Sequence, residues 1–197
     1  MRKLIVSTYM TLDGRVDAVQ DWAPPYDDPD SVEYHTELMR HSDGLILGRG
    51  TYELFAALWP PRAGTVPYVD QFSRMTKHVV STTRADLGWE NSRLLEGDPV
   101  EAIARLKGQP GGDLVMYGCH DLMHSLLGHD LIDEQRILIS PVLLGRGRSF
   151  LDDGAPRVDL ELVDTVVKSS GIVVLTYRPA RSAPSAGVST AVGQRAA

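Results

Sequence analysis

The chain has a single cysteine, Cys119, among its 197 residues. One thiol excludes a disulfide within the chain and is compatible with a reducing compartment. No run of apolar residues approaches the ~20 that a membrane-spanning helix needs. Residues 1–7 enter a strand pattern at once, without a signal-peptide cleavage site. These absences predict a cytoplasmic protein that does not enter a membrane.

An excess of positive charge is missing as well. Lysine and arginine together number 20 against 26 aspartates and glutamates, so the formal net charge is -6 and the isoelectric point is about 5.5. Proteins that bind a nucleic-acid backbone usually carry a basic face or stripe. The charge balance therefore argues against nucleic acid as a partner.

The chain does contain enough apolar material for one globular domain. Hydrophobic residues make up 43% of the sequence and charged residues 23%, at a length that supports a self-sufficient core. From Pro179 onward alanine, serine, glycine and arginine dominate, and no large apolar cluster occurs. We expect one folded domain over residues 1–179 and a disordered tail over residues 180–197.

Alternating strand and helix patterns predict an α/β fold with a mixed, mainly parallel sheet flanked by helices. The predicted strands cover residues 3–9, 44–48, 78–81, 114–117 and 136–144, followed by an antiparallel hairpin of residues 159–167 and 172–178. Pro141 predicts an irregularity in the strand 136–144, because proline cannot donate to the ladder. Helices are expected to start at Asp30 or Ser31, at Thr51, near residue 69, at Asp98-Pro99 and after residue 118.

Three of the predicted strands each end in a short polar turn that suits phosphate. The turns are Gly48-Arg49-Gly50-Thr51, Ser81-Thr82-Thr83-Arg84 and Tyr117-Gly118-Cys119-His120. In an open α/β sheet, ligands bind outside the carboxyl ends of the strands, where backbone N–H groups and helix N-termini face negative charge. Three such turns predict a groove for a dinucleotide.

Each turn offers different donors. Arg49 supplies a planar cationic fork beside the Thr51 hydroxyl, and Gly48 lets the backbone approach closely. The segment 81–84 combines three hydroxyls with a guanidinium, which suits a ribose phosphate such as that of NADPH. The N–H groups that follow Gly118 suit a pyrophosphate. A helix cap and a solvated turn remain the simpler alternatives, and the chain has neither a P-loop nor a Gly-x-Gly-x-x-Gly motif.

Five segments of the sequence, in order, carry a family resemblance. They are residues 11–14 (T-L-D-G), 43–53 (D-G-L-I-L-G-R-G-T-Y-E), 77–82 (K-H-V-V-S-T), 131–134 (L-I-D-E) and 140–147 (S-P-V-L-L-G-R-G). Together, across about residues 3–178, they resemble the dihydrofolate reductase superfamily. The most similar branch is the reductase domain of riboflavin biosynthesis, which is the C-terminal domain of the bacterial bifunctional deaminase-reductase. The resemblance implies a dihydrofolate-reductase-like fold, NADPH as hydride donor, a small-molecule substrate and a homodimer.

The same resemblance implies which residues contact the cofactor. The residues that would contact its phosphates are Gly48, Arg49 and Thr51 on the adenosine side, Ser81, Thr82 and Arg84 at the ribose phosphate, and Gly118, Cys119, His120 and Asp121 at the pyrophosphate. Dihydrofolate reductases also place an acid on the first helix, and this chain offers only Asp30 or Glu33 there without a clear match. Folate specificity therefore does not follow.

Hydride transfer leaves a negative charge on the acceptor, so an acid or an ordered water should face the nicotinamide. Asp13, in the loop after the first strand, is the first candidate for contact with the substrate, and Glu33 is the second. Each has a structural alternative, because Asp13-Gly14 is a common turn pair and Glu33 suits a solvated helix face. The sequence predicts a reductase that uses NADPH on a small heterocyclic (pterin- or pyrimidine-like) or carbonyl substrate.

Three alternative functions stay open. His120 and His124 lie one helical turn apart, as in zinc hydrolases, with His129 as a third ligand, but no separate carboxylate motif accompanies them and we expect no metal. Cys119 at a helix start could act as a nucleophile, although packing or cofactor lining is favoured. The domain could also bind a dinucleotide without turnover.

Two further segments have no assigned chemistry. The apolar strand 137–144 and the C-terminal hairpin are expected to form the surface of a dimer. The turn Gly145-Arg146-Gly147-Arg148 could bind an acidic group, but it is expected only to finish a strand with soluble residues.

Overall fold

A computed structural model describes residues 1–26, 28–83, 86–118 and 120–180. Arg84, Cys119 and all but the first residue of the tail expected over residues 180–197 lie outside the described residues. No helix in the described ranges is both long and apolar enough to cross a bilayer.

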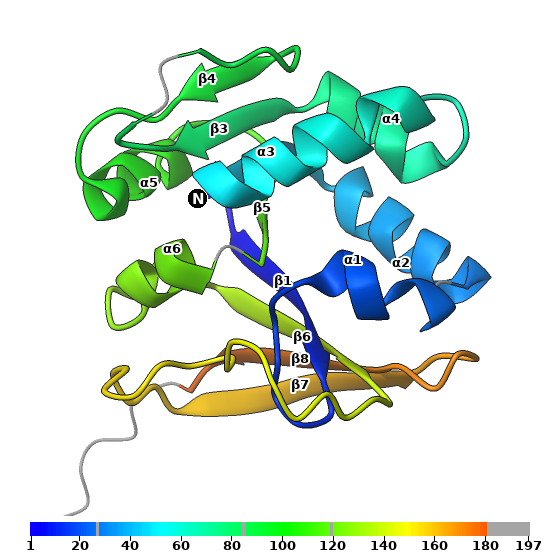
Figure 1. Ribbon diagram of the computed structural model, residues 1–197. Coiled ribbons are helices and arrows are strands. Elements are labelled where there is room, and N and C mark those ends of the chain that lie inside the picture. The colour runs from blue at the N-terminus through cyan, green and yellow to red at the C-terminus, as the bar shows by residue number, and fades with distance from the viewer. Residues whose placement is uncertain (27, 84–85, 119, 181–197) are drawn as a thin grey trace, which may run out of the picture.

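The described chain forms one sheet of eight strands, in the order β4-β3-β2-β5-β1-β6-β8-β7. In Figure 1 this sheet runs from β4 at the top to β7 at the bottom. The strands are β1 (Leu4–Thr11), β2 (Ser42–Gly48), β3 (Thr76–Val80), β4 (Ser92–Leu94), β5 (Asp113–Tyr117), β6 (Glu134–Ser140), β7 (Leu160–Val167) and β8 (Val173–Pro179).

Most neighbouring strands are parallel. The pairs β1–β5, β1–β6, β2–β3, β2–β5 and β3–β4 are parallel, whereas β8 is antiparallel to both β6 and β7. The predicted mixed sheet with a C-terminal antiparallel hairpin is confirmed. The lysine, two serines and glycine of residues 168–171 form the turn of that hairpin.

Helices cover both faces of the sheet, as strands that are apolar throughout require. The helices are α1 (Val19–Trp22), α2 (Pro29–Arg40), α3 (Arg49–Leu58), α4 (Pro67–Arg74), α5 (Pro99–Lys107) and α6 (His120–Leu126), with short 3-10 turns at Pro24–Tyr26 and Pro60–Arg62. Leu45 and Leu47 of β2 face α2, α3 and α4, while the intervening Ile46 faces α5 and α6. Figure 1 shows α5 and α6 on one side of the sheet and α2 and α4 on the other.

Several element boundaries differ from the sequence-based expectations. Asp28 caps α2, because its carboxylate accepts from the Ser31 N–H at 2.7 Å, so neither Asp30 nor Ser31 is the cap. Thr51 lies inside α3, whose N-cap is Gly48 without a side-chain hydrogen bond. The strand expected to reach residue 144 ends at Ser140, directly before Pro141. Asp98 caps α5 as predicted, by accepting from the Glu101 N–H.

Candidate functional site

The three polar turns lie side by side at the carboxyl edge of the sheet. They follow β3, β2 and β5, which are consecutive in the sheet and parallel to one another. Gly48 at the end of β2 pairs in register with Val80 at the end of β3, and Ile46 pairs with Met116 of β5. Segments that are far apart in the sequence are therefore neighbours along one edge.

The first two turns are in direct contact. Arg49 Nη1 donates to Thr83 Oγ1 at 3.4 Å, and the Thr83 N–H donates to Ser81 Oγ at 3.3 Å. Arg49, Thr82 and Thr83 are exposed, so their donors face solvent at this edge. A guanidinium beside several hydroxyls fits the charge and geometry of a phosphate monoester.

The third turn begins with a glycine in a left-handed conformation. Gly118 has φ of +57°, and no atom lies within 4 Å of the position that a Cβ would take. Its N–H donates to the Ser7 carbonyl at 3.0 Å, which ties the end of β5 to β1. A ligand can thus approach the Gly118 backbone closely.

Two residues predicted to hold the pyrophosphate have side chains engaged elsewhere. His120 Nε2 lies 2.9 Å from the carbonyl oxygen of Ser149, and the Asp121 carboxylate pairs with the Arg148 guanidinium. The hydrogen bond and charge of Arg148 lower the pKa of Asp121. Only the backbone of His120 and Asp121 is therefore offered to a phosphate.

Asp13, in the loop after β1, is bonded to the loop that follows β6. Its carboxylate accepts from the Thr11 hydroxyl at 2.6 Å, the Gly145 N–H at 2.7 Å and the Leu144 N–H at 3.1 Å. These hydrogen bonds, that of Thr11 first, lower the pKa of Asp13 to about 2. Asp13 is an ionised acceptor at neutral pH, which does not suit a proton donor. Glu33 lies exposed on α2.

A buried polar network joins α2 to β1 and to Tyr117, the residue before Gly118. His35 of α2 contacts the Tyr9 hydroxyl through Nε2 at 3.1 Å and the Tyr117 hydroxyl through Nδ1 at 3.0 Å. The Tyr34 hydroxyl contacts Ser7 Oγ at 2.9 Å. Burial lowers the pKa of His35 to about 3, so this imidazole is neutral and serves one tyrosine as donor and the other as acceptor.

Sequence reasoning did not single out this network. Tyr34 and His35 look like ordinary residues of an amphipathic helix, and Tyr117 looks like the last residue of a buried strand. The one available signal was the position of Tyr117 directly before Gly118, at the end of a strand that leads into a candidate phosphate turn.

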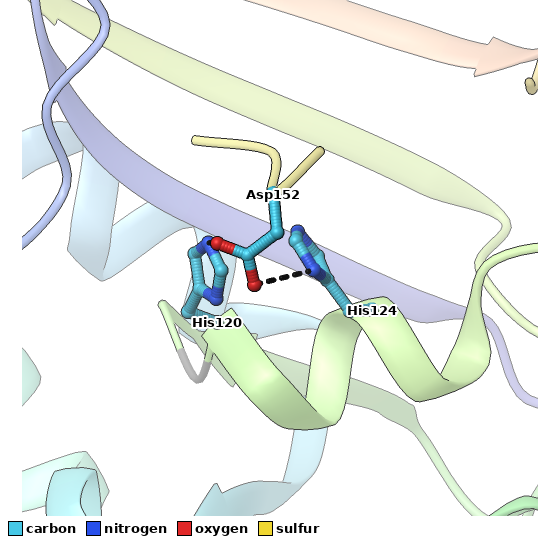
Figure 2. A group of neighbouring side chains, drawn as sticks. All are labelled: His120, His124 and Asp152. Atoms are coloured by element: carbon cyan, nitrogen blue, oxygen red, sulfur yellow. Dashed lines mark ion pairs between the residues drawn. The ribbon is translucent and has the colours of Figure 1, made fainter. Parts of the chain in front are cut away.

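The loop between β6 and β7 brings a further group to the start of α6. In Figure 2 the side chain of Asp152 lies against the rings of His120 and His124, and the ring centroids of the two histidines are 4.0 Å apart. His129, expected as the third member, is exposed and does not belong to this group. Arg148 of the same loop pairs with both Asp121 and Asp152, so the turn 145–148 does more than finish a strand.

Comparison with known protein families matches residues 2–174 to the family described as the RibD C-terminal domain. The protein YyaP of Bacillus subtilis is 28% identical over 183 residues, which cover 89% of this chain and 94% of the relative.

Solved structures are similar over most of the chain. A putative riboflavin biosynthesis protein from Shewanella sp. PV-4 has a TM-score of 0.74 and 25% identity, over 91% of this chain and 99% of that protein. Dihydrofolate reductase from Enterococcus faecalis, solved in complex with NADP(H), has a TM-score of 0.62 and 19% identity, over 90% and 96% of the two chains. The expected dihydrofolate-reductase-like fold is confirmed.

Proposed function

The chain belongs to the RibD C-terminal domain family, and on this premise we propose that it is a reductase that uses NADPH to reduce a small heterocyclic or carbonyl substrate. Family and fold together support an oxidoreductase in general terms, because the structural relatives include a reductase solved with NADP(H). The choice of NADPH and the class of substrate are the specific parts of the proposal.

One observation carries this proposal: the three polar turns are neighbours along the carboxyl edge of β3, β2 and β5. The exposed guanidinium of Arg49 is in contact with Thr83 and would supply a cation for the one phosphate that NADPH carries and NADH lacks. The open backbone at Gly118 allows a pyrophosphate to approach. We assign the ribose phosphate to the first two turns and the pyrophosphate to the third.

NADPH would supply the hydride, and the protein side chains would hold and orient the acceptor. Asp13 is ionised, its side chain is 20% exposed, and three of the roughly four acceptor sites of its carboxylate are in use. The Arg15 guanidinium lies 3.7 Å from the same carboxylate through Nε, so an N–H group of a pyrimidine-like ring would share the remaining site with this cation. The proton that follows the hydride would then come from another group or from water, because a carboxyl group with a pKa of about 2 carries no proton at neutral pH.

Replacement of Arg49 by alanine tests the cofactor assignment. A charge-assisted hydrogen bond contributes about 1.5–3 kcal/mol, so Arg49→Ala should weaken NADPH binding about 10- to 100-fold and NADH binding much less. Arg74→Ala is the matched control, because Arg74 is an exposed arginine at the end of α4, which leads into the opposite end of β3. Equal weakening of both cofactors by Arg49→Ala, or weakening of neither, would contradict the assignment.

A turnover assay tests the reductase proposal itself. The full chain would be mixed with NADPH and a panel of pterins, aminopyrimidines and small carbonyl compounds, and loss of NADPH absorbance would be followed. Oxidation with at least one compound is expected. Binding of NADPH without oxidation in any mixture would instead support a dinucleotide-binding module without turnover.

A further inference from the structure

The start of α6 and the loop between β6 and β7 bring three metal-binding side chains together. His120 and His124 are four residues apart on α6 and therefore share one face of the helix. Their side chains are only 10% and 15% exposed. Asp152 reaches this face from the loop (Figure 2). Within the described residues, this is the one group of three or more such side chains with ligand atoms lying within 4.8 Å of one another.

The distances from the carboxylate to the two histidines are close to those between ligands of a single ion. His120 Nε2 lies 3.7 Å from Asp152 Oδ1, and His124 Nδ1 lies 3.5 Å from Asp152 Oδ2. Two ligands at about 2.0–2.1 Å from a tetrahedral Zn²⁺ are about 3.3–3.4 Å apart. The three ligand atoms all lie within 4.8 Å of one another, so rotation of the side chains would bring them around one ion.

The cluster also has more hydrogen-bond acceptors than the two imidazoles can satisfy. His124 Nε2 lies 3.2 Å from the Phe150 carbonyl oxygen, while its Nδ1 faces the Asp152 carboxylate. A neutral imidazole has one N–H, so one of these nitrogens presents a lone pair to an acceptor. A cation between the rings and the carboxylate would accept this lone pair.

One of the two histidines has the outer contact that a metal-binding histidine usually has. A histidine that binds a metal through one nitrogen usually donates its other N–H to a carbonyl or a carboxylate. For His124, the Phe150 carbonyl accepts from Nε2 and leaves Nδ1 for the ion. For His120, Nε2 lies 2.9 Å from the Ser149 carbonyl oxygen, and the buried Nδ1 has no hydrogen-bond partner among the described residues. Metal binding through Nε2 would therefore replace the contact with Ser149, and Nδ1 would turn to the Asp121 carboxylate 3.6 Å away.

We propose that His120, His124 and Asp152 bind one zinc-class divalent cation, which fastens the loop between β6 and β7 to α6. Two imidazoles, which are borderline ligands, and one carboxylate, which is a hard ligand, suit Zn²⁺ and exclude neither Co²⁺ nor Ni²⁺. Three protein ligands leave one tetrahedral position for water or for the Ser149 carbonyl oxygen, which lies 2.9 Å from His120 Nε2. Arg148 holds the loop in the same place by pairing with Asp121 and Asp152.

Metal titration of the untagged, chelator-treated full chain tests the proposal. Calorimetry with ZnCl₂ should give one ion per chain with a micromolar or lower dissociation constant. His124→Ala and Asp152→Asn should each weaken binding about 100-fold or more, because loss of an outer-shell partner alone typically costs 10- to 100-fold. His129→Ala, which removes an exposed histidine just beyond α6, is the matched control and should bind like wild type.

Two measurements on the unaltered chain cover the case in which a variant fails to fold. Bound Co²⁺ should show the intense visible d–d absorption of four-coordinate geometry. Zn²⁺ should raise the midpoint of thermal unfolding, and this rise should disappear as the pH falls, because the histidines must be deprotonated to bind. Absence of Zn²⁺ binding, several weak sites, or equal binding by wild type, His124→Ala and Asp152→Asn would overturn the proposal.

Discussion

His35 is held neutral by its position in the core. The residue is 8% exposed, its ring contacts the hydroxyls of Tyr9 and Tyr117, and burial lowers its pKa to about 3. The unfolded chain takes up a proton at this histidine near pH 6.5, whereas the folded chain resists it until about pH 3. Acid therefore lowers the free energy of unfolding. The loss due to His35 begins as the pH falls through 6.5, the pKa of this histidine in the unfolded chain, and is absent at higher pH.

Unfolding by urea at several pH values tests this linkage. Between pH 6.5 and about 4.5, His35 alone should reduce the free energy of unfolding by about 1.4 kcal/mol for each unit that the pH falls. His35→Gln keeps hydrogen-bonding groups at the site but does not titrate, so its stability should fall less steeply.

A second histidine also contributes to the dependence of the free energy of unfolding on pH. Burial also lowers the pKa of His78, to about 4, so part of the pH dependence should remain in His35→Gln. His129→Gln, at an exposed position, is the control and should keep the wild-type slope. Identical slopes for wild type and His35→Gln would show that His35 is not the group responsible.

Two aspartates make contacts that the sequence did not predict. The pattern Asp13-Gly14 indicated a turn, and the structure adds that the Asp13 carboxylate also holds the backbone of residues 144 and 145. Asp152 gave no signal, because it becomes a neighbour of His120 and His124 only through the path of a long loop. Contacts of this kind depend on tertiary structure, and residue spacing does not encode them.

At the scale of elements, the start of α2 is joined to the hairpin turn between β7 and β8. The Asp28 carboxylate accepts from the N–H and hydroxyl of Ser31 within α2, and from Ser169 Oγ and the Ser170 N–H of the hairpin. Burial acts to raise the pKa of Asp28, but the hydrogen bonds of Ser31 and Ser170 outweigh it and hold the pKa well below its usual range. One ionised side chain thus fixes two elements.

Replacement of Asp28 should therefore cost more than the loss of an ordinary helix cap. A helix cap contributes about 1 kcal/mol, and Asp28→Ala should cost about 2 kcal/mol or more because the hairpin N–H of Ser170 also loses its partner. Asp98→Ala is the control, since Asp98 caps α5 through the Glu101 N–H. Chemical denaturation of both variants would measure the difference, and equal losses would contradict a second role for Asp28.

The elements that were predicted correctly are those with strong local patterns. Short apolar runs such as residues 44–48 and 114–117 form the buried strands β2 and β5. The short elements β4 and α1 were not predicted, because three or four residues carry too little periodicity. The end of β6 was placed too late because apolar residues continue past Pro141, although the ladder does not.

At the scale of the whole molecule, one edge of the sheet is unusually apolar. All eight residues of the edge strand β7 are exposed, among them Leu162 at 52% and Val166 at 46%. The strand β6, by contrast, lies between β1 and β8. The dimer surface was expected to include residues 137–144 and the hairpin. Of these, only the hairpin strand β7 lies at an edge of the sheet among the described residues. Exposed strand edges of this kind favour pairing with another chain.

We propose that β7 forms the contact with a second copy of the chain. Light scattering should then give the mass of a dimer for wild type, and a double variant with Leu162→Lys and Val166→Lys should give a monomer through charge repulsion across the contact. Leu54→Lys alters a leucine on α3 that is 37% exposed and should leave the dimer intact. A monomer mass for wild type at working concentration would refute the proposal.

The overall architecture followed from the family resemblance and from the alternation of strands and helices. The hydrophobic patterns did not predict the order of the strands in the sheet, because the local sequence of a parallel strand does not indicate which strands it pairs with. That order makes Gly48, Ser81 and Gly118 neighbours at one edge. The groove inferred from three separate turns therefore requires that β3, β2 and β5 be adjacent in the sheet.

The most direct test of the account is a crystal structure of the full chain with NADPH bound. The account predicts electron density across the carboxyl ends of β3, β2 and β5, with the ribose phosphate against Arg49 and the hydroxyls of residues 81–83 and the pyrophosphate over Gly118. NADPH bound at another surface, or no density for NADPH at concentrations that saturate other reductases, would contradict it.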